Sequence, residues 1–352
     1  MLRRLIAALA LSATVFAPAA EAAPKKSFDI AWTIYVGWMP WPYAADSGIV
    51  KKWADKYGLD IKVTQINDYV ESINQFTAGK FDGVTLTNMD ALTIPAAGGV
   101  DMTALIVGDF SNGNDGVVSK TAKSVAELKG ESINLVELSV SHYLLARALE
   151  ASGLSEKDVK VVNTSDADMV AAFKAPDVKT VVTWNPLLAE VKTEPGATAL
   201  FDSSKIPGEI IDLLGVNTET LKDNPDFGKA LVGIWYETLA LVVDPGEKGK
   251  AAREAMGKQS GTDLAGFEAQ LAATKLFATP AEAVAFAEGP EIVKTMDLVR
   301  TFSFDHGLLG EGAKSKDAVG IGFAGGKTLG DGANVKLRFD PSFMKMAADG
   351  KL

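Results

Sequence analysis

The chain has 352 residues, with 35 basic and 45 acidic side chains, two histidines and no cysteine. Its net charge of -10 argues against nucleic acid and against an anionic membrane as partners, because both repel an acidic protein. Without cysteine there can be no disulfide framework, so the fold must be held by its own hydrophobic cores.

The N-terminus has the three-part layout of a secretory signal peptide. Arg3 and Arg4 precede an apolar stretch at 5–17, and a small-x-small cleavage site follows at 20–22. The apolar stretch is shorter than the roughly 20 residues that a membrane-spanning helix needs. We therefore predict that residues 1–22 are removed. The mature chain, with 33 basic and 44 acidic residues, is then expected in the periplasm or outside the cell.

An apolar strand leading into an aromatic loop comes first in the mature chain. Residues 30–36 are rich in β-branched and aromatic side chains, which favours a strand. A loop is predicted from Gly37, and a helix is predicted to start at Asp46 or Ser47, either of which could cap it. The loop carries three aromatic residues, Trp38, Trp41 and Tyr43. Ligands of α/β proteins bind beyond the carboxyl ends of strands, so this loop predicts a small-molecule site.

Two α/β units follow one another along the chain. The first is a β-α-β-α-β unit with right-handed parallel crossovers, and its second helix has a capping box at Asp68 and Glu71. Small and turn-forming residues at 109–120 interrupt the pattern and predict a crossing into a second lobe. The alternation of strands and helices restarts there and continues to about residue 205.

The remainder of the chain predicts a return to the first lobe. Residues 218–307 are mainly helical in pattern, 307–332 are glycine-rich and irregular, and a short last helix is expected at 342–348. We predict a discontinuous first lobe at 27–112 plus 208–352 and a second lobe at 113–207. Two similar lobes joined by two crossings make a hinged clamp.

The chain resembles the solute-binding proteins of ABC importers of the nitrate, taurine and aliphatic-sulfonate type, which share a fold with the thiamine-pyrimidine precursor synthases. The resemblance covers roughly residues 28–240. Four segments carry it in order: YAADSGIVKKWADKYGLDIKV, INQFTAGKFDGVTLTNMDAL, SVAELKGESINLVELSVSHYLLARALEASGL and VVTWNPLLAEV.

This resemblance implies an α/β type II periplasmic binding protein. Such a protein has two Rossmann-like lobes with parallel-rich sheets, and its ligand lies in the cleft between them. It also implies a monomer that delivers its cargo to a membrane permease with an ATPase. Within the family, GWMPWPY and WNP are most similar to the branch that accompanies urea carboxylase, whose cargo is thought to be urea or guanidine. Taurine and sulfonate binders usually show W-D-P, where this chain has Trp184, Asn185 and Pro186.

The loops expected at the cleft contain no lysine or arginine. These loops are 37–43, 87–90, 109–115, 137–143, 163–168 and 183–186. A nitrate or sulfonate is bound most strongly by a guanidinium or ammonium donor, whereas carboxylates and aromatic faces suit a small planar cation. Guanidinium fits this composition, and neutral urea fits it less specifically. The candidate ligand-binding residues are Trp38, Trp41, Tyr43, Asn88, Asp90, Asp115, Glu137, Ser139, Ser141, His142, Trp184 and Asn185.

An anion remains the alternative cargo. Helices starting at Ser141 and near Asn185 would direct backbone N–H groups and positive dipole ends toward the cleft. The hydroxyls of Ser139 and Ser141, together with His142, could then hold taurine, an alkanesulfonate or nitrate without any arginine.

Enzymatic activity is the third and least favoured hypothesis. Ser139, Ser141 and His142 follow one another on one helix start, where they do not face each other, and there is no G-x-S-x-G motif. The precursor synthases of this fold use a cysteine-rich iron motif that this chain lacks. Two histidines without cysteine argue against zinc, and the G-x-G-x-x-G at 320–325 lacks the following helix of a dinucleotide site. We therefore predict a receptor with no cofactor and no metal.

Overall fold

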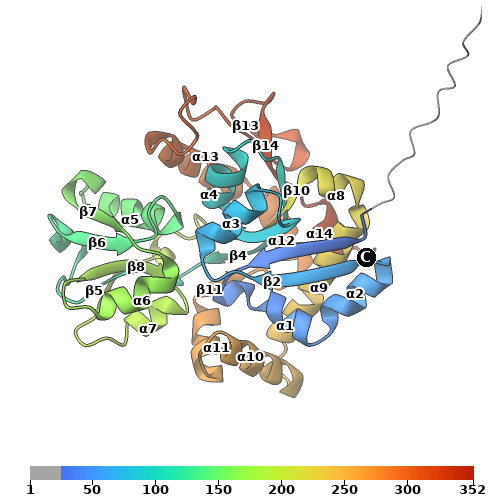
Figure 1. The fold of residues 1–352 in the computed structure, drawn as a ribbon, viewed down its shortest axis with the longest axis horizontal. Coiled ribbons are helices and arrows are strands. Elements are labelled where there is room, and N and C mark those ends of the chain that lie inside the picture. The colour runs from blue at the N-terminus through green and yellow to red at the C-terminus, as the bar shows by residue number, and fades with distance from the viewer. Residues whose placement is uncertain (1–24) are drawn as a thin grey trace, which may run out of the picture.

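A computed structural model describes residues 25–352, which form two lobes around two separate sheets (Figure 1). The predicted signal peptide, residues 1–22, lies outside the described residues. The larger lobe contains a nine-stranded sheet, and the smaller lobe, drawn in green in Figure 1, contains a five-stranded one. None of the helices in residues 25–352 is long and apolar enough to cross a membrane.

The larger sheet has the strand order β13-β12-β14-β4-β10-β3-β1-β2, with β11 paired to β4. Its strands are β1 (Ser27–Trp32), β2 (Asp60–Gln65), β3 (Gly83–Thr87), β4 (Met102–Ser111), β10 (Ile211–Asn217), β11 (Thr274–Leu276), β12 (Gly320–Gly322), β13 (Thr328–Leu329) and β14 (Val335–Phe339). The first three strands are parallel, as predicted, with Ile30 opposite both Val63 and Gly83. β10 returns from the smaller lobe and runs antiparallel between β3 and β4.

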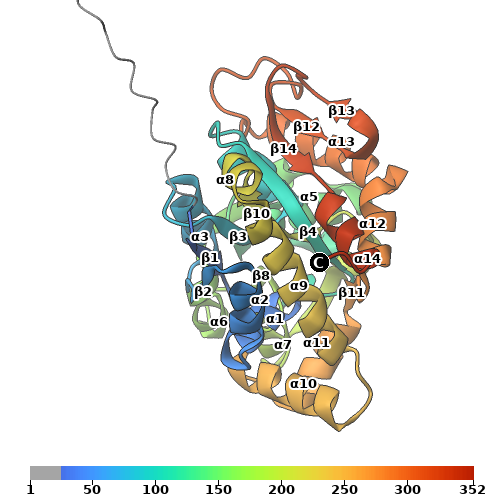
Figure 2. The ribbon, with the colours of Figure 1, turned by 90° about the vertical axis from the view of Figure 1, so that its right-hand side faces the viewer.

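Helices cover both faces of the larger sheet, and the long apolar helix α9 lies diagonally across one of them (Figure 2). The helices of this lobe are α1 (Pro40–Asp46), α2 (Ile49–Tyr57), α3 (Tyr69–Thr77), α4 (Asn88–Ala91), α8 (Thr218–Asp223), α9 (Pro225–Val242), α10 (Glu247–Gln259), α11 (Leu264–Ala272), α12 (Pro280–Glu288), α13 (Pro290–Asp305) and α14 (Ser342–Ala348). The capping box predicted at Asp68 is present in part, because its carboxylate accepts the N–H of Glu71 at 2.8 Å.

The smaller sheet has the strand order β7-β6-β8-β5-β9. Its strands are β5 (Asp115–Ser119), β6 (Ser132–Leu135), β7 (Lys160–Asn163), β8 (Thr180–Trp184) and β9 (Thr198–Asp202), and its helices are α5 (Val140–Ala151), α6 (Asp166–Lys174) and α7 (Leu187–Val191). β6 is parallel to β7 and β8, whereas β5 is antiparallel to β8 and β9. The carboxyl ends of β6 and β8 therefore face the larger lobe, where a ligand of this sheet would lie.

The crossings between the lobes are shorter than the sequence predicts. β4 continues to Ser111 and β5 begins at Asp115, so the crossing predicted within 109–120 occupies only 112–114. The polar residues of this stretch lie in strands because they have buried partners: Ser111 donates from its hydroxyl to Asp115 at 2.5 Å. The second crossing, at 203–210, leads into β10.

The predicted aromatic loop is largely helical. A 3-10 turn (Val36–Trp38) follows β1, and α1 begins at Pro40, a residue whose fixed φ angle favours the first turn of a helix. The helix predicted from Asp46 or Ser47 is present as α2, but it begins at Ile49 and neither residue caps it. Asp46 is instead the last residue of α1, and Gly48, with φ of 82°, separates it from α2. At the other end of the chain, the predicted last helix is confirmed as α14.

Candidate functional site

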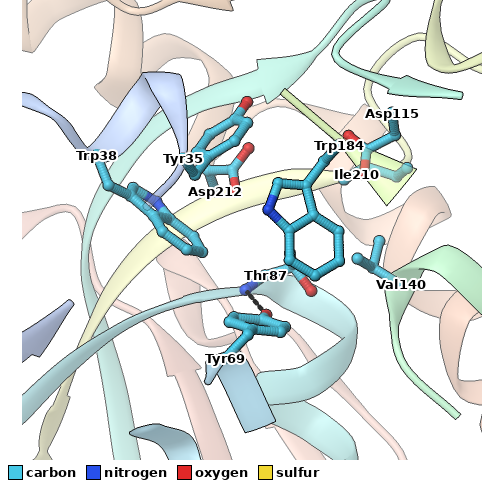
Figure 3. Close-up of a pocket in the computed structure, with 9 residues that line it drawn as sticks. All are labelled: Tyr35, Trp38, Tyr69, Thr87, Asp115, Val140, Trp184, Ile210 and Asp212. Atoms are coloured by element: carbon cyan, nitrogen blue, oxygen red, sulfur yellow. Dashed lines mark hydrogen bonds between the residues drawn. The ribbon is translucent and has the colours of Figure 1, made fainter. Parts of the chain in front are cut away.

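A small cavity lies between the two lobes, and about 280 Å³ in and around it, part of which is open solvent, is not filled by protein atoms (Figure 3). The larger lobe and the second crossing contribute most of its wall, and the smaller lobe contributes the rest from β5, β8 and the start of α5. The lining residues are Tyr35, Trp38, Tyr69, Thr87, Asp115, Val140, Trp184, Ile210 and Asp212, and none of them is basic. The cavity is therefore aromatic and acidic.

Aromatic rings from both lobes surround the cavity. The ring centroids of Trp38 and Tyr69 are 5.8 Å apart and those of Tyr69 and Trp184 are 5.6 Å apart, while Tyr35 meets Trp38 edge-on at 5.0 Å. Figure 3 shows Trp38 and Trp184 on opposite sides of the cavity, with Tyr69 beneath them. Contacts of this kind hold the rings in place, and their faces carry the negative potential that attracts cations.

Three carboxyl groups lie buried at one side of this aromatic cage. Asp115 and Asp212 line the cavity, and Asp109 lies behind them on β4. Burial raises the pKa of Asp115 to about 7 and that of Asp109 to about 7. Burial, followed by the charges of Asp109 and Asp115, also raises the pKa of Asp212 well above its ordinary value. A buried carboxylate without a positive partner is costly, which is the physical cause of all three shifts.

The carboxylate oxygens of Asp109 and Asp212 have fewer hydrogen-bond donors around them than they can accept. The hydroxyl of Tyr35 donates to Oδ1 of Asp109 at 3.2 Å, but no N–H or O–H of the described residues reaches Oδ2 of either aspartate. Two adjacent carboxyl groups in this setting can share a proton or bind a cation between them. The site therefore provides a place for a positive charge that the chain itself does not supply.

Gly37 makes room for this arrangement. A Cβ atom at position 37 would lie 2.5 Å from Oδ2 of Asp109 and 2.5 Å from a ring carbon of Tyr35. Both distances are far shorter than a van der Waals contact, so only glycine lets β4 approach the turn after β1 so closely.

Asp90 supports the floor of the cavity from behind. Its Oδ2 accepts hydrogen bonds from the hydroxyls of Tyr69 at 2.7 Å and Thr87 at 2.8 Å, and the Tyr69 hydroxyl accepts the Thr87 N–H at 2.9 Å. Burial raises the pKa of Asp90 to about 6. Asp90 thus orients two lining residues without itself lining the cavity.

Comparison with known proteins assigns the family. The sequence matches the NMT1/THI5-like family over residues 43–245. The chain belongs to this family. A relative in Brucella abortus (strain 2308), named for a binding role, is 26% identical over 246 residues, which are 67% of this chain and 73% of that protein.

Solved structures establish the fold of this NMT1/THI5-like protein. The alkanesulfonate-binding protein of Xanthomonas axonopodis pv. citri, bound to MOPS, matches with a TM-score of 0.68 at 18% identity, covering 84% of this chain and 99% of that one. The aliphatic sulphonate binding protein of Escherichia coli matches with a TM-score of 0.65 at 18% identity, covering 83% and 95%. The predicted mixed α/β periplasmic binding protein fold with two sheets is confirmed. These relatives are named as binding proteins, not as enzymes.

The structure brings three of the predicted site residues of this family member to the cavity wall: Trp38, Asp115 and Trp184. Trp41 does not join them, because α1 directs its ring into the core, where it stacks on Trp235 with centroids 5.4 Å apart. Tyr43 lies on the same short helix, half-buried, and does not line the cavity.

Two predicted asparagines secure the crossings between the lobes. Asn88 donates to the carbonyl of Glu209 at 3.1 Å and accepts the N–H of Ile211 at 3.0 Å, which fixes the start of β10. Asn185 donates to the side chain of Asn114 at 2.7 Å, which fixes the first crossing against β8. Neither asparagine lines the cavity.

The predicted residues around the start of α5 also lie away from the cavity. Glu137 is exposed to solvent. Ser139 caps α5: its hydroxyl accepts the N–H of Ser141 at 3.2 Å and donates to the carbonyl of Val136 at 2.7 Å. Ser141 is buried, and His142 faces Glu156 at 2.6 Å. Only Val140, between the two serines, lines the cavity.

Sequence reasoning missed six of the nine lining residues. Tyr35 falls in the predicted strand, Tyr69 falls in a predicted helix, and Ile210 and Asp212 fall in the predicted return to the first lobe. Asp212 did carry a signal, since it is a lone carboxylate inside the apolar run IIDLLGV, and buried acids without partners are rare outside functional sites.

Proposed function

We propose that this protein is the periplasmic receptor of an ABC importer, and that its cargo is a small, flat, nitrogen-rich cation of the guanidinium type. The observation that carries the proposal is the interlobe cavity, where four aromatic rings and two carboxylates meet with no lysine or arginine in the lining. A monomer that closes its lobes over such a cargo would deliver it to a membrane permease and its ATPase.

The chemistry of guanidinium matches the cavity. Its N–H groups lie along the edge of a plane and pair with carboxylates, while its faces stack on aromatic rings. Asp115 and Asp212 offer acceptors at one side, and Trp38 and Trp184 offer faces from opposite lobes. Each cation–π contact contributes roughly 0.5–2 kcal/mol, more when water is excluded. The cavity is small and accommodates a cargo of only a few heavy atoms.

Neutral urea fits the same space but not the same charges. Urea can donate hydrogen bonds to Asp115 and Asp212, but it brings no positive charge to offset the three buried carboxyl groups. We therefore rank guanidinium above urea as cargo.

A small anion is the second candidate, on one specific observation. Val140, the first residue of α5, lines the cavity, so the N-terminal end of this helix faces it with the positive end of its dipole. The alkanesulfonate-binding protein with the same fold was solved with MOPS. An anion would, however, lie against Asp115 and Asp212, and it would bind only when these carboxyl groups hold protons.

A calorimetric ligand panel tests the proposal. Guanidinium chloride, urea, taurine, methanesulfonate and sodium nitrate would each be titrated at millimolar concentration or below, with sodium chloride as the salt control. We expect guanidinium to bind with a dissociation constant near about 1 µM, which corresponds to about -8 kcal/mol. Binding of taurine or nitrate without guanidinium binding would select the anion receptor. Chemical turnover of any ligand, followed by mass spectrometry, would make the protein an enzyme.

A further inference from the structure

The chain has two histidines, and both contact the same glutamate where the lobes meet. Nε2 of His142 lies 2.6 Å from Oε1 of Glu156, and Nε2 of His306 lies 2.7 Å from Oε2 of Glu156. His142 is on α5 and Glu156 begins a 3-10 turn (Glu156–Asp158), both in the smaller lobe. His306 follows the last residue of α13 in the larger lobe. The contact therefore connects the lobes.

The hydrogen bonds of the two imidazole rings indicate the charge of each histidine. Nδ1 of His306 lies 2.8 Å from the carbonyl of Phe302, so it must donate, and Nε2 must also donate to reach Glu156; this imidazole is therefore protonated on both nitrogens. Nδ1 of His142 accepts the N–H of Leu138 at 3.1 Å, so this imidazole is neutral and donates from Nε2. A positive His306 thus faces a negative Glu156 across the boundary.

The pKa of Glu156 agrees with this assignment. Burial opposes its ionised form, but the hydrogen bond from His142 and the charge of His306 outweigh burial and lower its pKa. The ring of Phe302 stacks on His306 with centroids 3.9 Å apart and meets His142 edge-on at 6.1 Å. An ion pair that is packed and partly shielded from water contributes more than an exposed one.

We infer that His142, Glu156 and His306 form an interlobe clasp that stabilises the closed arrangement of the lobes and thereby strengthens cargo binding. None of the three lines the cavity, so each acts as a positioning residue and not through contact with the cargo. The inference rests on the proposed function only in that the lobes close over a cargo.

The same three side chains also have the composition of a metal site, with their ligand atoms within 4.8 Å of one another. A histidine that binds a metal through Nε2 usually donates its Nδ1–H to an acceptor. His142 does the reverse, because the backbone N–H of Leu138 points at its Nδ1. This hydrogen bond favours the clasp over a metal site.

The clasp must be distinguished from the other charged groups that lie around it. The neighbouring charged groups on α5 have partners of their own: Arg147 pairs with Glu209 and Glu150, and Tyr143 donates to Glu209. Beside Glu156, Asp158 pairs with Lys129. The interlobe distance should therefore report on the clasp itself.

Distance measurements between the lobes test the inference directly. The chain has no cysteine, so spin labels can be placed at exposed Lys80→Cys in the larger lobe and Lys192→Cys in the smaller lobe. In the cargo-free protein we expect His306→Gln and Glu156→Gln to reduce the closed fraction. His306→Lys, which keeps a positive donor, should keep the closed fraction of the parent protein.

The controls separate a clasp from a general loss of packing. Glu150→Gln removes an exposed partner of Arg147 within the smaller lobe and should leave the distances unchanged. Guanidinium affinity should fall about threefold to tenfold in His306→Gln, and His306→Lys should restore it. Unchanged interlobe distances in both His306→Gln and Glu156→Gln would overturn the clasp. Closure by micromolar Zn²⁺ that His306→Gln abolishes would overturn it in favour of a metal site.

Because the distance measurement needs no cargo, its result is independent of the ligand panel. If no ligand of the panel binds but His306→Gln still opens the protein, the clasp stands and the proposed function fails.

Discussion

Two groups of carboxylates lie where the lobes meet, and they differ in what neutralises them. Asp109, Asp115 and Asp212 have no basic partner, and burial raises the pKa of each. Glu209 pairs with Arg147 at 2.9 Å, and Glu156 pairs with two histidines, which lower its pKa. Carboxylates of the second group are neutralised within the chain, whereas those of the first require a proton or a cation from solution.

This difference separates structural acids from candidate binding acids. A buried acid with a raised pKa destabilises the empty protein, and clusters of such groups are typical of functional sites. Acids that are paired with a base stabilise the protein, because removing one of them leaves the base without its partner. Substitutions in the two groups should therefore change stability in opposite directions.

Substitution of Asp212 by Asn should have the largest effect. We expect guanidinium affinity to fall at least about thirtyfold, since loss of one member of a buried charge pair costs about 2–5 kcal/mol. The melting temperature without cargo should rise at pH 8, because a buried carboxyl with a raised pKa is removed. Calorimetry and thermal melting measure both quantities. Asp177→Asn, on the exposed surface, is the matched control, and full affinity in Asp212→Asn would remove this residue from the site.

Substitution of Glu209 by Gln tests the paired group. Arg147 would lose its ionised partner and Tyr143 a strong acceptor, so the free energy of unfolding should fall by about 1–2 kcal/mol. Denaturant unfolding measures the change. Glu150→Gln removes the exposed partner of the same arginine and should cost less than about 0.5 kcal/mol. A stability gain in Glu209→Gln would contradict the distinction between the two groups.

The pH dependence of cargo affinity and of stability should be the smallest of these effects. Its sign is fixed by the raised pKa values of the buried aspartates. Asp109 and Asp115 have pKa values of about 7, so below that pH a cation must displace a proton, and its affinity should fall about tenfold per unit. These carboxyl groups have a pKa of 3.8 in the unfolded chain and of about 7 in the folded protein. Between these two pH values only the folded state holds the protons, so the empty protein should lose stability as the pH rises. Calorimetry from about pH 5 to pH 8 tests both. Tighter binding on acidification would favour the anion.

Local patterns were sufficient to predict much of the fold. The parallel strands β1 to β3 follow from alternating apolar residues, and the cap at Asp68 follows from a rule that involves only near neighbours. The lack of lysine and arginine in the cleft could also be predicted, because that prediction requires only the residue types in the loops expected there.

Contacts between distant segments could not be predicted in the same way. Asp212 reaches the cavity because β10 inserts between β3 and β4, a pairing that no local pattern specifies. Trp38 and Trp41 stand three positions apart beside similar prolines, yet only the packing of α1 on α9 decides which ring faces the cavity. The meeting of His142 with His306 depends in turn on how the two lobes close.

The missing side chain at position 37 has a consequence for comparing receptors of this fold. A methyl group there would force both the Asp109 carboxylate and the Tyr35 ring to move, because its carbon would lie 2.5 Å from an atom of each. Gly37→Ala should therefore alter cargo choice by shifting a buried negative charge and one ring of the cavity wall, although it replaces none of the lining residues. Relatives with a larger residue at this position would need a different arrangement of charge, and hence a different solute.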